Sequence, residues 1–127
     1  MIKGIEQYYQ LIAEAIDESI NESWVTATLN AIFYDDSITL EAEYRRPNGK
    51  DVSFHMPPKA RIAFQAIRAK FAEAGEPVWG QAHFEMNSNG KFKMDFGYKD
   101  CDERGNTHFD PDAWQAHQEE RLRRLSS

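Results

Sequence analysis

The chain has 127 residues, of which 41% are apolar, so one hydrophobic core can form without a disulfide or a metal ion. Its one cysteine, Cys101, excludes an internal disulfide. No apolar run approaches the ~20 residues of a membrane span, and residues 1–6 lack a signal-peptide pattern. We therefore expect a cytoplasmic protein in a reducing compartment.

The net charge of −6 is unevenly distributed, because residues 1–44 carry one Lys and nine acidic residues whereas residues 45–127 are slightly basic. The acidic first part disfavours direct binding of nucleic acid and would attract a basic protein partner. A surface of this kind can also serve solubility alone.

The first half of the chain predicts one helix and three strands. Residues 2–21 place apolar side chains three and four positions apart, which indicates an amphipathic helix. Residues 24–34 and 38–44 alternate apolar and polar side chains around the turn Asp35-Asp36, which indicates two strands. Asn48-Gly49 is a strong hairpin signal, so a short third strand over residues 52–56 completes an antiparallel meander.

The second half predicts helix, hairpin and helix. Pro57-Pro58 favours the start of a helix over residues 59–74, and Gly75 suits its C-terminal cap. Residues 78–86 and 91–98 predict two strands joined by a turn. A loop over residues 99–109 follows. Asp110-Pro111 then opens a last helix to about Leu125.

The expected fold is α+β, with the order α-β-β-β-α-β-β-α in a single domain over residues 1–127. One antiparallel five-stranded sheet should have three helices packed mainly on one face. The apolar face should carry Val25, Leu29, Ile38, Leu40, Val52, Phe54, Phe84, Phe92, Met94 and Phe96. The opposite face should be polar, with threonines, His55, His83, Glu41, Glu43, Glu85 and Asp95. That face is either solvated or bound by a partner.

Few residues suggest chemistry. His55, His83 and the nearby carboxylates are possible ligands for a small molecule or a metal ion, although no pair has a recognised ligand spacing. Cys101 lies among acidic neighbours that would repel a thiolate, which argues against a nucleophile. A serine nucleophile elbow, a phosphate-binding glycine loop and an HExxH motif are all missing. We expect no catalytic activity, no cofactor and no metal site.

The hairpin carries a resemblance. The segments Glu76-Pro77-Val78-Trp79, His83-Phe84-Glu85-Met86 and Asn89-Gly90-Lys91-Phe92-Lys93-Met94-Asp95-Phe96-Gly97-Tyr98-Lys99-Asp100 resemble the YezG-like family of bacterial immunity proteins. The resemblance implies an antitoxin of contact-dependent bacterial competition. Such a protein would neutralise a cognate toxin by stoichiometric binding that covers or distorts the toxin's active site. The toxin is expected to be basic, and nucleases are frequent among such toxins.

The candidate partner-binding residues are acidic or aromatic groups near strand ends: Asp35, Asp36, Glu41, Glu43, Tyr98, Asp100 and Asp102. The acids could pair with toxin Lys and Arg side chains, and Tyr98 would add apolar contact area. Two alternatives stay open. One is a small ligand- or metal-binding domain that uses the face around His55 and His83, and the other is a homodimeric adaptor.

Overall fold

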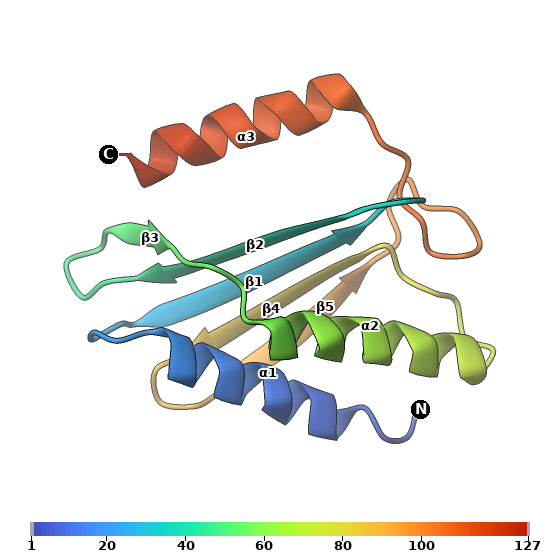
Figure 1. Cartoon of the computed structure of the whole chain (residues 1–127), viewed down its shortest axis with the longest axis horizontal. Coiled ribbons are helices and arrows are strands. Elements are labelled where there is room, and N and C mark those ends of the chain that lie inside the picture. Colours follow the sequence, from blue (N-terminus) through green and yellow to red (C-terminus); the bar gives the residue numbers. More distant parts are fainter. Residues whose placement is uncertain (1, 127) are drawn as a thin grey trace.

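A computed structural model describes residues 2–126 and confirms the predicted α+β fold and element order (Figure 1). The elements are α1 (Glu6–Ser19), β1 (Thr26–Phe33), β2 (Ile38–Arg45), β3 (Asp51–Ser53), α2 (Pro58–Glu73), β4 (Gln81–Asn87), β5 (Phe92–Gly97) and α3 (Pro111–Leu125). β3 is shorter than predicted and ends before His55.

The five strands form one antiparallel sheet in the order β3-β2-β1-β4-β5. The predicted meander of the first three strands is confirmed. Its second turn depends on Gly49, whose φ of 90° lies in the left-handed region that glycine adopts without steric cost. β1 is the central strand, where Ala31 pairs with Leu40 on one side and with Ala82 on the other.

The hydrophobic core lies between the apolar sheet face and the two helices α1 and α2 (Figure 1). Its largest fully buried side chains are Trp79, Phe64, Phe84, Ile12, Ile16, Leu29 and Ile67. The hairpin residues Phe92, Met94 and Phe96 pack against this core, as expected from their alternation. Val25 was predicted to face the core, but it precedes β1 and is 44% exposed.

The third helix, α3, lies over the opposite, polar face of the sheet (Figure 1). Two helices therefore share the apolar face, and the polar face is partly covered. None of the residues of α3 is buried, so apolar packing does not hold it. Its basic side chains instead reach carboxylates on β2 and β3. A mainly polar helix suits a polar face for this reason.

No helix within residues 2–126 has both the length and the apolar character that crossing a bilayer requires.

Candidate partner-binding surface

The loop over residues 99–109 is ordered against the end of the central strand β1. Within the loop, Cys101 and Thr107 form an antiparallel bridge, and His108 N donates to Asp100 O at 2.7 Å. Thr107 N also donates to the carbonyl of Phe33, the last residue of β1, at 2.7 Å. The loop thus extends the sheet locally. Its acidic residues are held next to the turn that joins β1 and β2.

Arg68, on α2, binds the 99–109 loop from the side of the core. Its Nη2 donates to Gly105 O at 2.6 Å, and its Nε donates to Trp79 O at 3.2 Å. The guanidinium also lies 4.2 Å from the ring centroid of Phe33, within the range of a cation–π contact. Nη2 also donates to Arg104 O at 3.2 Å. Burial lowers the pKa of this guanidinium, but its three donor contacts and the contact with the aromatic ring hold it in place. The loop is consequently tied to the core rather than free in solvent.

Gly105 lets the loop approach this closely. Its φ is 79°, and a Cβ at this position would lie 2.5 Å from Val78 Cγ1 and 2.8 Å from Trp79 O. Both the conformation and the space therefore favour glycine. The position shows that the loop has one defined docking arrangement.

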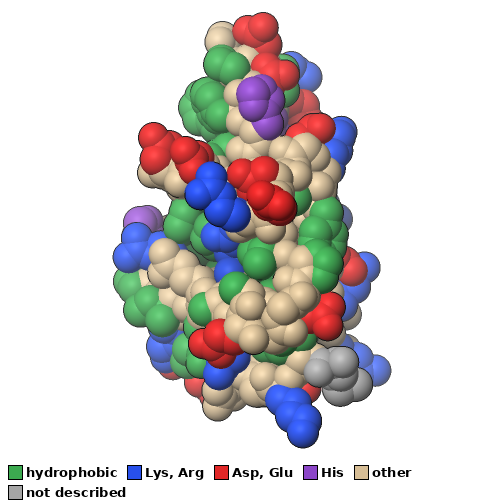
Figure 2. All heavy atoms as spheres, turned by 90° about the vertical axis from the view of Figure 1, so that its right-hand side faces the viewer, with side chains coloured by type: hydrophobic (Ala, Val, Ile, Leu, Met, Phe, Trp, Pro, Cys, Tyr) green, Lys and Arg blue, Asp and Glu red, His purple; other side chains and the backbone are tan. Residues whose placement is uncertain are grey.

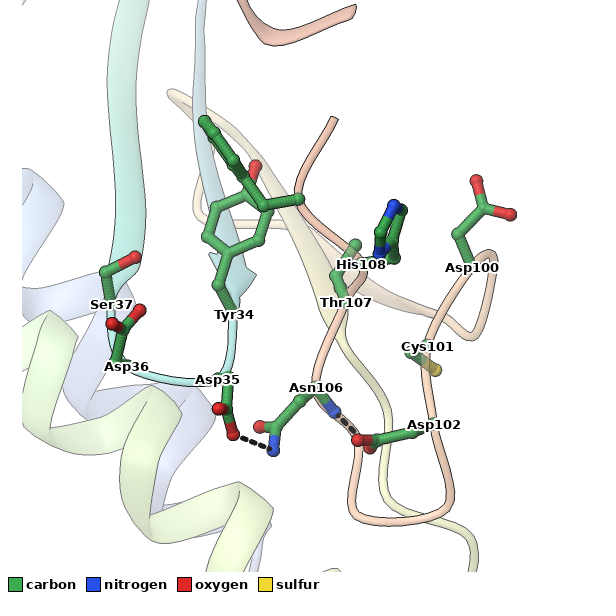
Figure 3. A pocket seen from close by; sticks show the side chains of 11 residues that line it. Tyr34, Asp35, Asp36, Ser37, Asp100, Cys101, Asp102, Asn106, Thr107 and His108 are labelled. Atoms are coloured by element: carbon green, nitrogen blue, oxygen red, sulfur yellow. Dashed lines mark hydrogen bonds between the residues drawn. The ribbon is translucent and has the colours of Figure 1, made fainter. Parts of the chain in front are cut away.

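Four of the predicted partner-binding residues meet around one hollow of about 640 Å³. Asp35 and Asp36 come from the β1–β2 turn, whereas Asp100 and Asp102 come from the loop 64 or more residues later. Asn106 links the two segments, because its Nδ2 donates to Asp35 Oδ1 at 3.4 Å and its N donates to Asp102 Oδ1 at 2.9 Å. Figure 3 shows Asp35 and Asp102 on either side of Asn106, with Asp100 directed away from them.

The four aspartates keep their negative charge available. None of them forms a salt bridge within residues 2–126, and neither Lys nor Arg lines the hollow. Backbone hydrogen bonds from Asn106 and Arg104, together with the charges of Arg104 and Arg68, hold the pKa of the Asp102 carboxyl below its usual value. The space-filling view of this end of the molecule shows acidic side chains in several separate groups, with Lys or Arg side chains between two of them (Figure 2).

Glu41 and Glu43, also predicted to bind a partner, are engaged by α3 instead. Glu41 is only 6% exposed and accepts hydrogen bonds from His117 Nε2 at 3.0 Å and Gln118 Nε2 at 3.0 Å. Glu43 accepts from Arg121 Nε at 2.6 Å and from Arg124 Nη1 at 2.5 Å. Arg121 Nε also lies 3.9 Å from Glu41 Oε2, so arginines of α3 supply the cationic partners of both residues.

The balance of charge and burial at Glu43 favours the ionised form. Burial raises the pKa of its carboxyl, but the hydrogen bonds and charges of Arg124 and Arg121 outweigh burial and leave the pKa below its usual value. Glu43 is therefore an anion that fastens α3 to the sheet.

Tyr98, the remaining predicted residue, is 47% exposed just after β5, and it does not line the hollow. Its hydroxyl donates weakly to Pro77 O at 3.4 Å. The aromatic residues that do lie beside the acids are Tyr34 and Phe109, whose ring centroids are 5.3 Å apart. Sequence reasoning missed this pair. The available signal was their position directly before Asp35 and Asp110 in the two acidic segments.

The alternative site around His55 and His83 does not form. β2 and β1 lie between β3, which precedes His55, and β4, which carries His83. The Nδ1 atom of His83 lies 2.5 Å from the side-chain oxygen of Asn30, its partner across β1. Among residues 2–126 no three His, Cys, Asp or Glu side chains are grouped so that they could hold a metal ion.

Comparison with known proteins identifies the family of this chain. A family model described as "Immunity protein YezG-like" matches residues 5–120, from the residue before α1 into the second half of α3. The chain belongs to the YezG-like immunity protein family. The resemblance found in the hairpin is thereby confirmed. A curated relative, "Immunity protein YezG" of Bacillus subtilis (strain 168), is 23% identical, and the match covers 76% of this chain and 74% of the relative.

Membership in the family supports an immunity role for this YezG-like protein and favours a binding function over catalysis. The match includes both segments that line the hollow, since the β1–β2 turn and the 99–109 loop fall within residues 5–120. The family model thus spans the surface described above as well as the hairpin.

Proposed function

We propose that this YezG-like protein is an antitoxin that neutralises a cognate toxin by direct, one-to-one binding through the acidic hollow. The observation that carries the proposal is the meeting of Asp35, Asp36, Asp100 and Asp102 around one cavity, where none of them forms a salt bridge within residues 2–126. Carboxylates without a close ion-pair partner can accept charge-assisted hydrogen bonds from the Lys and Arg side chains of a basic partner.

The rest of the molecule provides an internal contrast. On the polar sheet face, Arg121 lies 3.9 Å from Glu41 and 2.6 Å from Glu43, and Arg124 lies 2.5 Å from Glu43. Within residues 2–126 the four aspartates of the hollow form no salt bridge, although Asp102 experiences the charges of nearby arginines, Arg104 and Arg68. Unpaired surface charge of one sign speeds association with an oppositely charged surface and favours the correct partner over others. We therefore assign the toxin contact to the hollow rather than to Glu41 and Glu43.

The proposed partner is a basic toxin domain, and a nuclease fits best. A nuclease binds the phosphate groups of its substrate with Lys and Arg side chains. Carboxylates held by the ordered 99–109 loop could pair with those same side chains and keep the nucleic acid out. Because Arg68 and Gly105 fix the loop before binding, little conformational entropy is lost when the complex forms.

We expect the reading frame next to this gene to encode the toxin, and the proposal is tested with that toxin domain, purified in a catalytically inactive form. Isothermal titration should give a one-to-one complex whose affinity falls as salt is added. The double variant Asp35→Asn/Asp36→Asn should bind at least tenfold more weakly, mainly through slower association. When the catalytically active toxin is used instead, an equimolar amount of the wild-type protein should abolish the toxin's activity.

A matched control uses two exposed acids on α1, in the variant Glu14→Gln/Asp17→Asn. It loses the same formal charge away from the hollow, so its affinity should stay within about twofold of wild type. Equal losses of affinity in both variants would show that net charge alone causes the effect, and would contradict a localised site. Absence of any complex with the neighbouring toxin would refute direct neutralisation.

A further inference from the structure

A second hollow opens between the N-terminal half of α3 and the polar face of the sheet. Its volume is about 350 Å³. The floor includes Ile32 of β1 and Gln81 of β4, and Ala113 and Trp114 of α3 lie along its other side. We call this space the α3 groove. It exists because α3 is fastened to β2 and β3, near its C-terminal end, and leaves β4 and β5 free of a helix on this face.

An aromatic row of Tyr34, Phe109 and Trp114 lies beside the α3 groove, with Tyr34 and Trp114 lining the groove and Phe109 lining the acidic hollow. The ring centroids of Tyr34 and Phe109 are 5.3 Å apart, and those of Phe109 and Trp114 are 6.4 Å apart. Phe109 is 46% exposed and Trp114 is 41% exposed. Large aromatic side chains that stay this accessible are typical anchors of protein interfaces. This row is the part of the surface best suited to contact an apolar group.

The α3 groove is continuous with the acidic hollow. Tyr34, Asp100, Thr107 and His108 line both spaces. A bound partner that reaches the four aspartates therefore has a direct path to Trp114. Two acidic residues, Asp100 and Asp110, and one basic residue, Lys99, line the groove, so the net charge of its lining is negative.

We propose that the α3 groove receives an apolar or aromatic side chain of the toxin, flanked in the toxin by Lys or Arg residues that pair with Asp100 and Asp110. This inference rests on the proposed antitoxin function and specifies the shape and chemistry of the partner surface. The acidic hollow selects for positive charge, whereas the groove selects for an apolar side chain that fits beside Trp114. Together they would distinguish the cognate toxin from other basic proteins.

The test compares two alanines three positions apart on α3. Ala113 lines the groove, whereas Ala116 is exposed and does not line it. Ala113→Trp should fill the groove and weaken binding of the inactive toxin domain at least tenfold by titration. Ala116→Trp adds the same side chain to the same helix and should change the affinity by less than twofold. Circular dichroism melting curves should show that both variants remain folded.

A second pair removes side chains instead of adding them. Trp114→Ala should weaken toxin binding at least tenfold, whereas Leu122→Ala, at a side chain 66% exposed on the same helix, should not. If the toxin binds Ala113→Trp and Trp114→Ala as tightly as wild type, the groove is not part of the interface, while direct neutralisation stands. If wild-type protein forms no complex, both the groove contact and the proposed function are wrong.

Discussion

Replacing Glu43 by Gln should release α3 from the sheet while leaving the core intact. The Glu43 side chain is 12% exposed and binds two arginines of α3. Its bond to Arg121, 15% exposed, is well shielded, and a shielded bond to a charged group contributes about 1.5–3 kcal/mol. Arg124 is 39% exposed, so its pair adds only about 0.2–1 kcal/mol. Because Gln keeps one acceptor oxygen, we expect a net loss of about 2 kcal/mol, roughly 30-fold in the docking equilibrium.

Hydrogen exchange of the α3 backbone amides measures this loss directly. Protection in α3 should fall roughly 30-fold in Glu43→Gln, whereas protection in β1 and β4 should be unchanged, because the core lies on the other sheet face. The control Glu119→Gln removes a carboxylate of α3 that accepts from Gln115, and it should have no effect. Unchanged protection of α3 in Glu43→Gln, or an equal loss across the whole sheet, would refute the view that these ion pairs specifically fasten α3.

Three further perturbations follow from the same contacts. Arg68→Met should lower the free energy of unfolding by about 2–3 kcal/mol in urea titrations, since the carbonyls it binds lose a charged donor. It should also weaken toxin binding. Gly105→Ala should cost about 3 kcal/mol, against about 1 kcal/mol for Gly90→Ala, which shares the positive φ but has open space around it. Because the pKa of Glu43 is lowered, its stabilisation of α3 should be complete well above its usual value of 4.5 and be lost as the pH falls below it. Protection of α3 should therefore be constant from about pH 6 to 8 and fall below about pH 4; a loss on raising the pH instead would reverse the sign.

The element order could be predicted because local signals agree with the fold. Asn48-Gly49 marks a tight turn, Gly75 suits a helix end, and Asp110 caps α3 by accepting from the backbone N of Asp112 and Ala113. Alternation along β1 and β4 then separates an apolar face from a polar face. Each of these signals acts within a few residues, so one sequence is enough to read it.

The side of the sheet on which α3 lies could not be predicted in the same way. Apolar periodicity indicates which face of a helix packs against a core. It gives no such indication for α3, which has no buried residue. Its position depends on pairs such as Glu41 with His117 and Glu43 with Arg121, which are 76 and 78 residues apart. For the same reason the sequence places Glu41 and Glu43 among the candidate partner-binding residues, because nothing in it shows that α3 binds them.

The candidate site also has one part that the sequence predicts and another that it does not. That Asp35, Asp36, Asp100 and Asp102 are acidic and lie near strand ends is visible in the sequence. That they surround one hollow depends on Thr107 bonding to Phe33 and on Arg68 holding the loop. These are long-range contacts between a loop, a strand end and a helix, and no local pattern encodes them.

We propose above that the acidic hollow neutralises a toxin by direct binding. The most direct measurement titrates the toxin domain encoded beside this gene with wild-type protein and with Asp35→Asn/Asp36→Asn, and follows toxin activity. Direct binding through the hollow predicts complete inhibition at a one-to-one ratio for the wild-type protein. It also predicts that the double variant must be in clear molar excess over the toxin to reach the same inhibition. Inhibition by both proteins at the same ratio and affinity, or by neither, would contradict it.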